Sequence, residues 1–402
     1  MQRAADESLI TPQFALVTVV ALAVFVGYSF TIPVLPRFIE GPLGGGSLAV
    51  GIGVGVLSVS AVLGRPFFGR VGDRSGRKVL ILAGALAMAV GTGLLVVVDS
   101  YAGLILLRLL VGAGEGAFFV GAATLVNDLS PPHRRGEAHS YFSVAVYLSL
   151  GLGPLAGELL LDIDHYDRVW IAGAVVTLLG LLLATRLPAH VVPLDDEDRP
   201  VASRRLVHPA GLGPGLVIGL GVMGYVGFSA FVPLYVDDLG LGGAGPVFAM
   251  YAVIVLAVRL LGARLPDRLG PALVGRVAII CSAVGLAFVA AVPSRLGLYL
   301  GTAVLAVGMS LMYPALITLA TSRADDSEQA SVIATFTGFF DLAAGAGGAL
   351  LGGVAAATGY RGAFAAGAAV AMSGLIVLAR VAEPSSTVGP GADGPSTPRA
   401  RG

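Results

Sequence analysis

The sequence contains few of the residues that a soluble or nucleic-acid-binding protein needs. Only 12% of its 402 residues are charged, and the formal net charge is zero. A balanced charge argues against a nucleic-acid partner, because phosphate contacts need an excess of basic side chains. The single cysteine, Cys281, excludes both a disulfide framework and a cysteine-based metal site. We therefore expect no metal, no cofactor and no nucleic acid.

A phosphate-binding loop is also missing. No Gly-Lys-Ser or Gly-Lys-Thr sequence occurs in the chain, so ATP-driven activity has no support. Residues Gly112 to Gly116 look like part of a nucleotide-binding glycine loop, but they lie inside a long apolar segment without a preceding strand. We expect neither ATP binding nor an enzyme.

Apolar residues dominate what is present. Hydrophobic residues account for 56% of the chain, and the mean hydropathy is +0.87, which leaves too few polar side chains to cover a soluble surface. A window of about 19 residues finds twelve apolar runs, each long enough to cross about 30 Å of hydrocarbon as a helix. They lie near residues 14–38, 47–68, 79–98, 102–126, 138–161, 169–187, 212–236, 244–265, 272–293, 296–321, 329–357 and 362–381. Because backbone groups cannot stay unpaired in lipid, the sequence predicts an all-α integral membrane protein with twelve transmembrane helices.

A polar stretch divides the runs into two sets of six. We predict an N-terminal six-helix bundle over 1–187, a cytoplasmic linker over 188–210, a C-terminal six-helix bundle over 211–382 and a tail over 383–402. The linker contains an acidic run and several arginines, which is typical of a solvated connection. The tail is largely Pro, Gly, Ser and Thr and cannot bury enough apolar surface to fold, so we expect a disordered cytoplasmic tail.

Basic residues are distributed unevenly between the runs. If the N-terminus lies inside, the far more numerous set that includes Arg65 and Arg259 falls on the cytoplasmic side, as the positive-inside rule requires. The opposite face then carries only Arg37, Arg168, Arg295 and Arg361. An even number of spans places both termini in the cytoplasm. Short loops and an arginine-rich, nearly lysine-free composition favour a bacterial inner membrane.

The two halves repeat one another. One constant sequence offset relates five identical pairs, and it also aligns Gly151 and Gly153 with Gly345 and Gly347. The pairs are Arg65/Arg259, Arg70/Arg264, Asp73/Asp267, Arg74/Arg268 and Gly76/Gly270. Facing repeats of this kind predict two pseudo-symmetric bundles that give alternating access to a site between them.

Residues Gly69 to Lys78 form a specific motif. Their sequence, GRVGDRSGRK, resembles the cytoplasmic loop between the second and third helices of the major facilitator superfamily. Its glycines permit a tight turn, and its basic cluster suits the cytoplasmic face. The resemblance implies a gate that latches one conformational state, formed by Gly69, Asp73, Arg74, Gly76, Arg77 and Lys78 together with the repeat copies Asp267 and Arg268.

Two further segments resemble signatures of this family. Arg108 to Gly116 is similar to the fourth-helix signature, an arginine followed by small residues. Gly151 to Gly157 is similar to the Gly-Pro signature of the fifth helix in drug–proton antiporters, through Gly153, Pro154 and Gly157. The resemblance implies a secondary transporter and favours efflux in exchange for protons.

Three charged residues, Arg108, Glu115 and Asp341, lie deep within apolar runs. Each costs about 2.5–3.5 kcal/mol at the bilayer centre and needs a partner or a cavity. Arg108 and Glu115 are two helical turns apart, about 10.5 Å, on one face with Gly112 between them. We interpret Glu115 as a proton-coupling or substrate-binding residue modulated by Arg108, and the alternative is a structural ion pair. Asp341 has no intramembrane basic residue near it in sequence, so it is a second proton-coupling candidate or a hydrogen-bond partner of a neighbouring helix.

The family resemblance also implies where a solute binds. The first, fourth, seventh and tenth helices line the cavity in this family, and they nominate Tyr28, Thr31, Tyr225, Ser229, Ser310 and Tyr313. Aromatic rings with polar tips suit amphiphilic ligands, while ordinary helix packing is the alternative at each position.

The sequence therefore predicts a proton-coupled secondary transporter that exports a small amphiphilic solute, such as a drug-like compound, a sugar or a metabolite. Its partners are the solute, protons and the lipid bilayer. Two alternatives stay open. One is a proton symporter that imports a sugar or another organic solute, and the other is a non-transporting membrane receptor or scaffold on the same fold.

Overall fold

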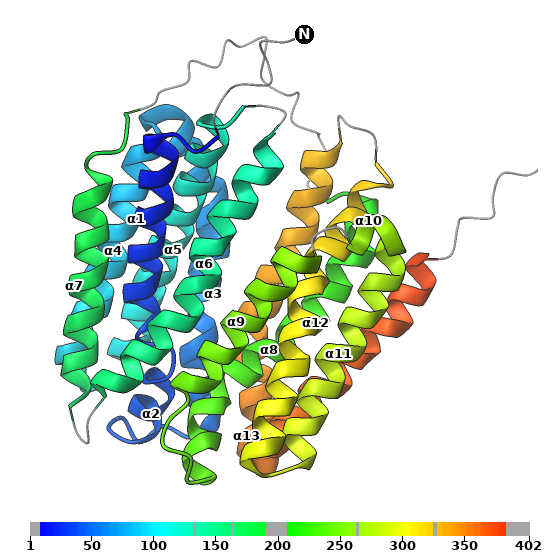
Figure 1. Ribbon diagram of the computed structural model, residues 1–402. Coiled ribbons are helices and arrows are strands. Elements are labelled where there is room, and N and C mark those ends of the chain that lie inside the picture. Colours follow the sequence, from blue (N-terminus) through cyan, green and yellow to red (C-terminus); the bar gives the residue numbers. More distant parts are fainter. Residues whose placement is uncertain are drawn as a thin grey trace, which may run out of the picture.

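The computed structural model describes residues 9–131, 134–161, 165–189, 207–262, 265–324 and 328–382, and every regular element in these ranges is a helix. Figure 1 shows two groups of long helices, α1 to α7 on one side and α8 to α13 on the other. The two groups meet near α2 and diverge toward α10 (Figure 1), so we refer to these as the α2 end and the α10 end. Most of the predicted linker and the whole predicted tail lie outside the described residues.

The helices of the first half are α1 Pro12–Ser29, α2 Leu35–Glu40, α3 Ser47–Ser75, α4 Arg77–Gly93, the 3-10 helix η2 Leu94–Val97, α5 Tyr101–Asp128, α6 Arg135–Leu160 and α7 Tyr166–Ala184. Those of the second half are α8 Pro209–Asp238, α9 Gly245–Gly262, α10 Leu265–Leu269, α11 Pro271–Ala291, α12 Arg295–Thr321 and α13 Gln329–Ala382.

Twelve membrane spans are confirmed, with the last two joined in one helical element. Eleven of the described helices are long and apolar enough to cross a membrane. The longest, α13, contains Gly359 with φ 77° and ψ 176°, and the chain reverses there instead of continuing as a helix. α13 therefore supplies two spans, which correspond to the predicted runs 329–357 and 362–381.

We predicted one span over residues 14–38, and this prediction was wrong, because the run is divided into two helices. α1 ends at Ser29, and α2 begins only at Leu35. Pro33 has no backbone N–H and disfavours helical geometry at the residue before it, while Pro36 occupies the first turn of α2. The break directs α2 across the end of the bundle, which places Arg37 between the two halves.

Buried apolar side chains form three clusters. One lies within the first half around Phe14, Met88 and Phe118, and one lies within the second half around Met312 and Phe336. The third crosses between the halves near α2 and joins residues of both, including Ile39, Trp170, Phe231, Leu351 and Phe364. Apolar packing therefore closes the α2 end of the molecule.

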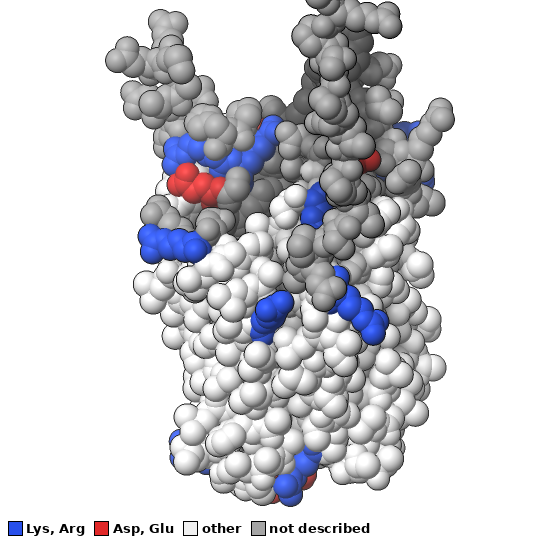
Figure 2. All heavy atoms as spheres, turned by 90° about the vertical axis from the view of Figure 1, so that its right-hand side faces the viewer, with Lys and Arg blue, Asp and Glu red and all other residues white. Residues whose placement is uncertain are grey.

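The outer surface suits a lipid environment. Figure 2 shows a wide belt of uncharged side chains along the helices, with basic side chains gathered mainly toward the α10 end. On helices of the first half, apolar side chains such as Leu63, Leu106 and Leu182 are each more than half exposed. Lipid tails can solvate such residues, whereas water would not.

Glycine lets α3 and α13 touch across the interface between the halves. A Cβ built on Gly51 would lie 2.0 Å from the carbonyl oxygen of Gly348, and one built on Gly348 would lie 2.2 Å from that of Gly51. One turn further along, a Cβ on Gly55 would lie 2.6 Å from the Gly345 oxygen. No residue with a side chain fits at these positions without separating the helices.

We expect Gly348→Ala to reduce stability, since its methyl group meets backbone on α3. Overpacking of this kind costs about 1–3 kcal/mol. Gly353→Ala is the matched control, because a Cβ at Gly353 meets nothing within 4 Å. Thermal unfolding of purified protein in detergent measures both. Equal melting temperatures for the two variants would contradict the proposed close contact.

Candidate functional site

An ion pair between α3 and α13 joins the two halves, and we refer to it as the central ion pair. Nη2 of Arg65, on α3, donates a hydrogen bond of 3.0 Å to Oδ1 of Asp341, on α13, and Nη1 contacts Oδ2. The Asp341 side chain is 12% exposed and the Arg65 side chain 38%. Arg65 ends the apolar window Ser47–Arg65, and Asp341 lies within the next-to-last span. The acidic residue predicted from the sequence thus has a basic partner from the opposite half.

Glu115 lies beside this ion pair. It is a partly buried residue in the middle of α5, and it makes no hydrogen bond with any described residue. The charged groups close enough to act on it electrostatically are Arg65 and Asp341. One guanidinium therefore faces two carboxyl groups, Glu115 from its own half and Asp341 from the other.

Arg108 does not interact with Glu115, which corrects the arrangement drawn from their spacing. Its Nε donates to the Gly53 oxygen at 3.0 Å and its Nη2 to the Val54 oxygen at 3.2 Å, so it binds the backbone of α3. Its guanidinium also lies 5.9 Å from the ring centroid of Tyr28. The space at Gly112 is filled by α3 as well, because a Cβ there would lie 2.0 Å from the Leu57 oxygen. Close packing of α3 on α5 explains both residues.

Arg259 forms the counterpart of the central ion pair. Its Nη2 donates a hydrogen bond of 2.6 Å to the hydroxyl of Tyr147, on α6, and its guanidinium lies 4.2 Å from the ring centroid. The offset that relates Arg65 to Arg259 also relates Tyr147 to Asp341. The pseudo-symmetry therefore maps one inter-half contact onto the other, with a tyrosine in place of the aspartate.

From the sequence, Arg65 and Arg259 were assigned to cytoplasmic segments, and no partner in the opposite half was predicted for either. Both side chains reach into the interface between the halves. The available signal was their position in the repeat. Each precedes the loop motif inside an apolar run, where a charge is too costly to be incidental.

Tyrosines gather around Arg259. The rings of Tyr225 on α8 and Tyr251 on α9 are stacked, with centroids 5.1 Å apart and an interplanar angle of 23°. Tyr313 on α12 packs edge-on against Phe336 at 5.5 Å. Tyr147 is close enough to interact electrostatically with all three tyrosines. Two of the predicted cavity residues, Tyr225 and Tyr313, thus lie at the central site.

The other predicted cavity residues make local contacts. The hydroxyls of Thr31 and Ser229 donate to oxygens of the preceding turn, and that of Ser310 donates to the Val255 oxygen at 3.0 Å. Tyr28 lies under Arg108. These hydroxyls support the helices instead of offering free donors to a ligand.

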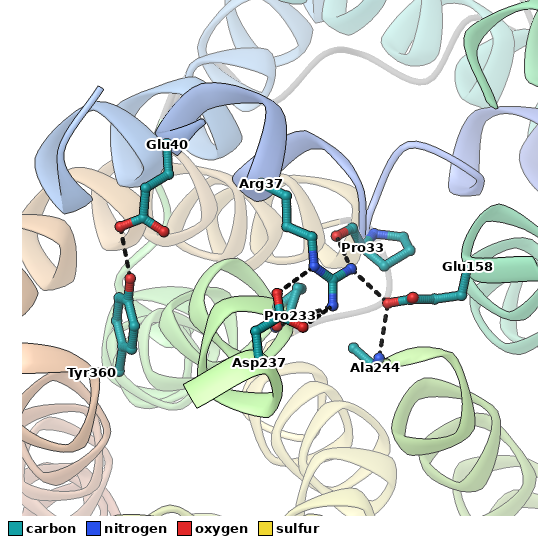
Figure 3. Close-up of polar contacts among 8 residues, drawn as sticks. All are labelled: Pro33, Arg37, Glu40, Glu158, Pro233, Asp237, Ala244 and Tyr360. Carbon is teal, nitrogen blue, oxygen red and sulfur yellow. Dashed lines mark hydrogen bonds and ion pairs between the residues drawn. The ribbon is translucent and has the colours of Figure 1, made fainter. Parts of the chain in front are cut away.

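A second polar network closes the α2 end (Figure 3). Arg37 donates from Nε and Nη2 to the carboxylate of Asp237, on α8, at 2.5 and 2.8 Å, and from Nη1 to Glu158, on α6, at 2.7 Å. Glu158 also accepts from the Ala244 backbone N–H, and the Tyr360 hydroxyl donates to Glu40. We call these residues the α2-end clamp. Burial alone would lower the pKa of Arg37, but Asp237 and Glu158 raise it, so the guanidinium stays charged.

The sequence did not predict the α2-end clamp. It indicated only that Arg37 and Glu158 lie near the membrane surface. They are far apart in the sequence although they pair within one half, and their other partners, Asp237 and Ala244, come from the opposite half. Pro33 supplies the one local contact, because its oxygen accepts from Arg37 Nη1 at 3.0 Å (Figure 3).

The predicted loop gate makes contacts within its own half in this structure. Gly76, with φ 89°, ends α3 and begins α4, and its repeat copy Gly270 has φ 84° before α11. Both glycines make the tight turn that the motif predicts. Arg77 pairs with Asp128, and Lys78 donates to the Thr185 oxygen.

The remaining gate residues with described side chains lie at the surface. Arg74 and Arg268 are exposed, and a Cβ on Gly69 would meet nothing within 4 Å. The side chains of Asp73 and Asp267 lie outside the described part of the structure.

The fifth-helix motif packs α6 against the end of α1. A Cβ at Gly153 would lie 2.3 Å from the Ser29 Cβ, and one at Gly157 would lie 2.3 Å from the Phe30 oxygen. Pro154 stands inside α6 between them. Gly153 and Gly157 therefore join helices of the same half, whereas Gly151 faces α9 of the other half, where its Cβ would lie 2.7 Å from the Ala252 Cβ.

Comparisons with known proteins agree with this architecture. The sequence model of the Major Facilitator Superfamily matches residues 17–348. An uncharacterised MFS-type transporter of Pseudomonas aeruginosa is 30% identical over 377 residues, covering 89% of this chain and 90% of the relative. Another, of Salmonella typhimurium, is 28% identical over 375 residues, covering 89% and 94%.

Solved structures show the same fold at low sequence identity. The nucleoside transporter NupG superimposes with a TM-score of 0.73 at 13% identity, over 92% of this chain and 99% of its own. A POT family transporter in complex with a conjugated peptide gives 0.75 at 14% identity, over 92% and 96%. A bacterial homologue of the lysosomal transporter Spinster, in an inward-facing and unoccupied conformation, gives 0.73 at 16% identity, over 94% and 96%.

Breaking the α2-end clamp should open this end of the molecule. Arg37→Gln leaves Glu158 and Asp237 without their shared cation, and truncating one partner of a buried charge pair costs about 2–5 kcal/mol. We expect spin labels at Pro42→Cys and Ala357→Cys, in a Cys281→Ser background, to show a population at longer distance in pulsed EPR.

The matched control for this experiment is Arg295→Gln. Arg295 is exposed, and its guanidinium lies 5.8 Å from the ring centroid of Tyr299, in the same half. It makes no other ion pair or side-chain hydrogen bond with a described residue. The distance distribution of Arg295→Gln should equal that of the spin-labelled protein in which both Arg37 and Arg295 are unchanged. Identical distributions for Arg37→Gln and Arg295→Gln would mean that apolar packing alone holds the α2 end closed.

Proposed function

The chain belongs to the Major Facilitator Superfamily, and from this premise we propose that it is a proton-coupled secondary transporter that exports a small amphiphilic solute. Family membership makes it a multi-span membrane transporter of a small-molecule solute, and its relatives are bacterial. We place the α10 end in the cytoplasm of a bacterial inner membrane, because basic side chains gather there (Figure 2).

The observation that supports proton coupling is the pairing of Arg65 with Asp341 across the halves, beside Glu115. Alternating access requires the halves to move relative to each other, which separates α3 from α13. Asp341 is largely buried, so its ionised carboxylate is unfavourable when the guanidinium of Arg65 moves away. A proton on Asp341 removes the negative charge and with it the attraction that opposes separation.

Glu115 completes the exchange. It belongs to the same half as Arg65, so it stays near the guanidinium when Asp341 moves away. Ionised Glu115 neutralises Arg65 in that state, and protonated Asp341 needs no counter-charge. Proton binding and reorientation of the halves are thereby linked, while Arg65 always keeps one carboxylate.

The efflux direction is supported by the fifth-helix motif. Gly153, Pro154 and Gly157 resemble the signature of drug–proton antiporters, and they set the contact between α6 and α1. Tyr225, Tyr251 and Tyr313 provide aromatic surface with polar tips beside the charged centre, which suits an amphiphilic solute.

Proton–solute symport is the second candidate, and one observation favours it. A proton on Asp341 releases the guanidinium of Arg65, which can then hold an anionic group of a solute. Proton and solute would then bind together instead of in exchange. The direction of proton movement distinguishes the two mechanisms.

We expect proteoliposomes to show solute-dependent proton movement opposite to the solute. Asp341→Asn and Glu115→Gln should each reduce this movement to less than about a tenth of the wild-type rate, because an amide cannot carry the proton. A pH-sensitive dye inside the vesicles measures proton movement, and labelled amphiphiles measure solute movement.

Glu137→Gln is the control for charge removal, since Glu137 is exposed and its described ion pair is with Arg134, in its own half. It should transport at the wild-type rate. Proton movement in the same direction as the solute would replace antiport by symport. Solute movement without any proton movement would overturn the proposed coupling.

A further inference from the structure

Arg259 lacks the carboxylate that its repeat counterpart has. Arg65 is neutralised by Asp341, but the position equivalent to Asp341 is Tyr147, whose hydroxyl carries no charge. Among the described residues, no ion pair involves Arg259. Its Nε is buried and has no hydrogen-bond acceptor in the described structure. Within the described part of the chain, Arg259 is thus a half-buried cation that has no carboxylate partner and one unsatisfied donor.

Arg259 is half-buried, and its guanidinium has five N–H donors, of which Tyr147 receives one. The buried Nε is the costly donor, because a buried N–H without an acceptor loses its hydrogen bond to water. A cation–π contact with the Tyr147 ring compensates part of this cost, and no more. An anion from outside the chain would satisfy the remaining donors.

The surroundings of Arg259 suit a flat apolar body next to that anion. Tyr225 and Tyr251 present stacked rings, and Tyr313 lies near enough to interact electrostatically with both Arg259 and Arg65. Three of these four aromatic residues belong to the second half, and Tyr147 belongs to the first. A ligand held here would contact both halves at once.

We propose that the central site binds an organic anion, an aromatic carboxylate, whose carboxylate takes the place at Arg259 that Asp341 takes at Arg65. The carboxylate accepts hydrogen bonds from Nε and a terminal nitrogen of Arg259, the bidentate geometry that a guanidinium provides. The aromatic body packs among the tyrosines. This inference names the substrate class of the transport site, and it rests on the proposed function.

Binding of matched probes to purified protein in detergent tests the charge requirement. The probes are 2-naphthoate, the neutral 2-naphthamide and the cationic 2-naphthylmethylamine, at equal ionic strength. A ligand that binds only the folded protein raises its melting temperature in a saturable way. We expect saturable stabilisation of the wild type by 2-naphthoate alone.

Two variants locate the site. Arg259→Gln should weaken 2-naphthoate binding by about tenfold or more, since the charge-assisted hydrogen bonds are lost. Tyr147→Asp gives Arg259 a carboxylate partner, as Asp341 does for Arg65, so it should abolish binding of 2-naphthoate. Its melting temperature without ligand should stay at or above that of the wild type. Arg295→Gln, an exposed arginine outside the site, should bind 2-naphthoate as the wild type does.

The proposal is overturned if no naphthoate binds in the millimolar range, if the amide or the amine binds equally well, or if Tyr147→Asp binds with unchanged affinity. The probe comparison decides on the wild type even if Arg259→Gln does not fold. Failure of the anion site is distinct from failure of proton coupling. If 2-naphthoate binds but no protons move, the anion site is supported and proton coupling is contradicted. If protons move with a neutral solute and 2-naphthoate does not bind, proton coupling is supported and the anion site is contradicted.

Discussion

Arg65 and Asp341 belong to different halves, and the carboxylate of Asp341, with its side chain 12% exposed, is unfavourable without the guanidinium of Arg65. This requirement connects the parts of the molecule. It holds α3 against α13 in the present conformation, where Gly51 and Gly348 let the two backbones touch. It also gives Glu115 a positive neighbour. In the mechanism that we propose, separation of the halves depends on a change of charge at Asp341.

The α2-end clamp and the central pair share one arrangement. Each contains an arginine from the first half that faces one carboxyl group in its own half and one in the other. Arg37 has Glu158 and Asp237, and Arg65 has Glu115 and Asp341. Such an arginine can exchange one acceptor for the other as the halves separate, so its charge remains compensated in both conformations. The two networks can therefore open and close without exposing an unpaired cation.

The repeat is symmetric in its backbone and asymmetric in its charges. Gly76 and Gly270 adopt the same left-handed turn, and Arg65 and Arg259 both cross the interface. The difference lies at the paired positions Asp341 and Tyr147, where one arginine is neutralised by the chain and the other is not. In the mechanism that we propose, this asymmetry separates two tasks, proton exchange at one arginine and solute recognition at the other.

The sequence by itself determined the membrane class, the twelve spans, the repeat and the family, because run length, periodic glycines and the loop motif are local properties that lipid and turn geometry impose. It also identified Glu115 and Asp341, since a charge in an apolar run stands out without a structure. Only the tertiary structure decided which charges meet. Arg108 binds the backbone of α3 instead of Glu115, and Arg65 and Arg37 find partners in the other half. These contacts depend on how the helices pack across the interface between the halves, and spacing along one helix carries no information about that.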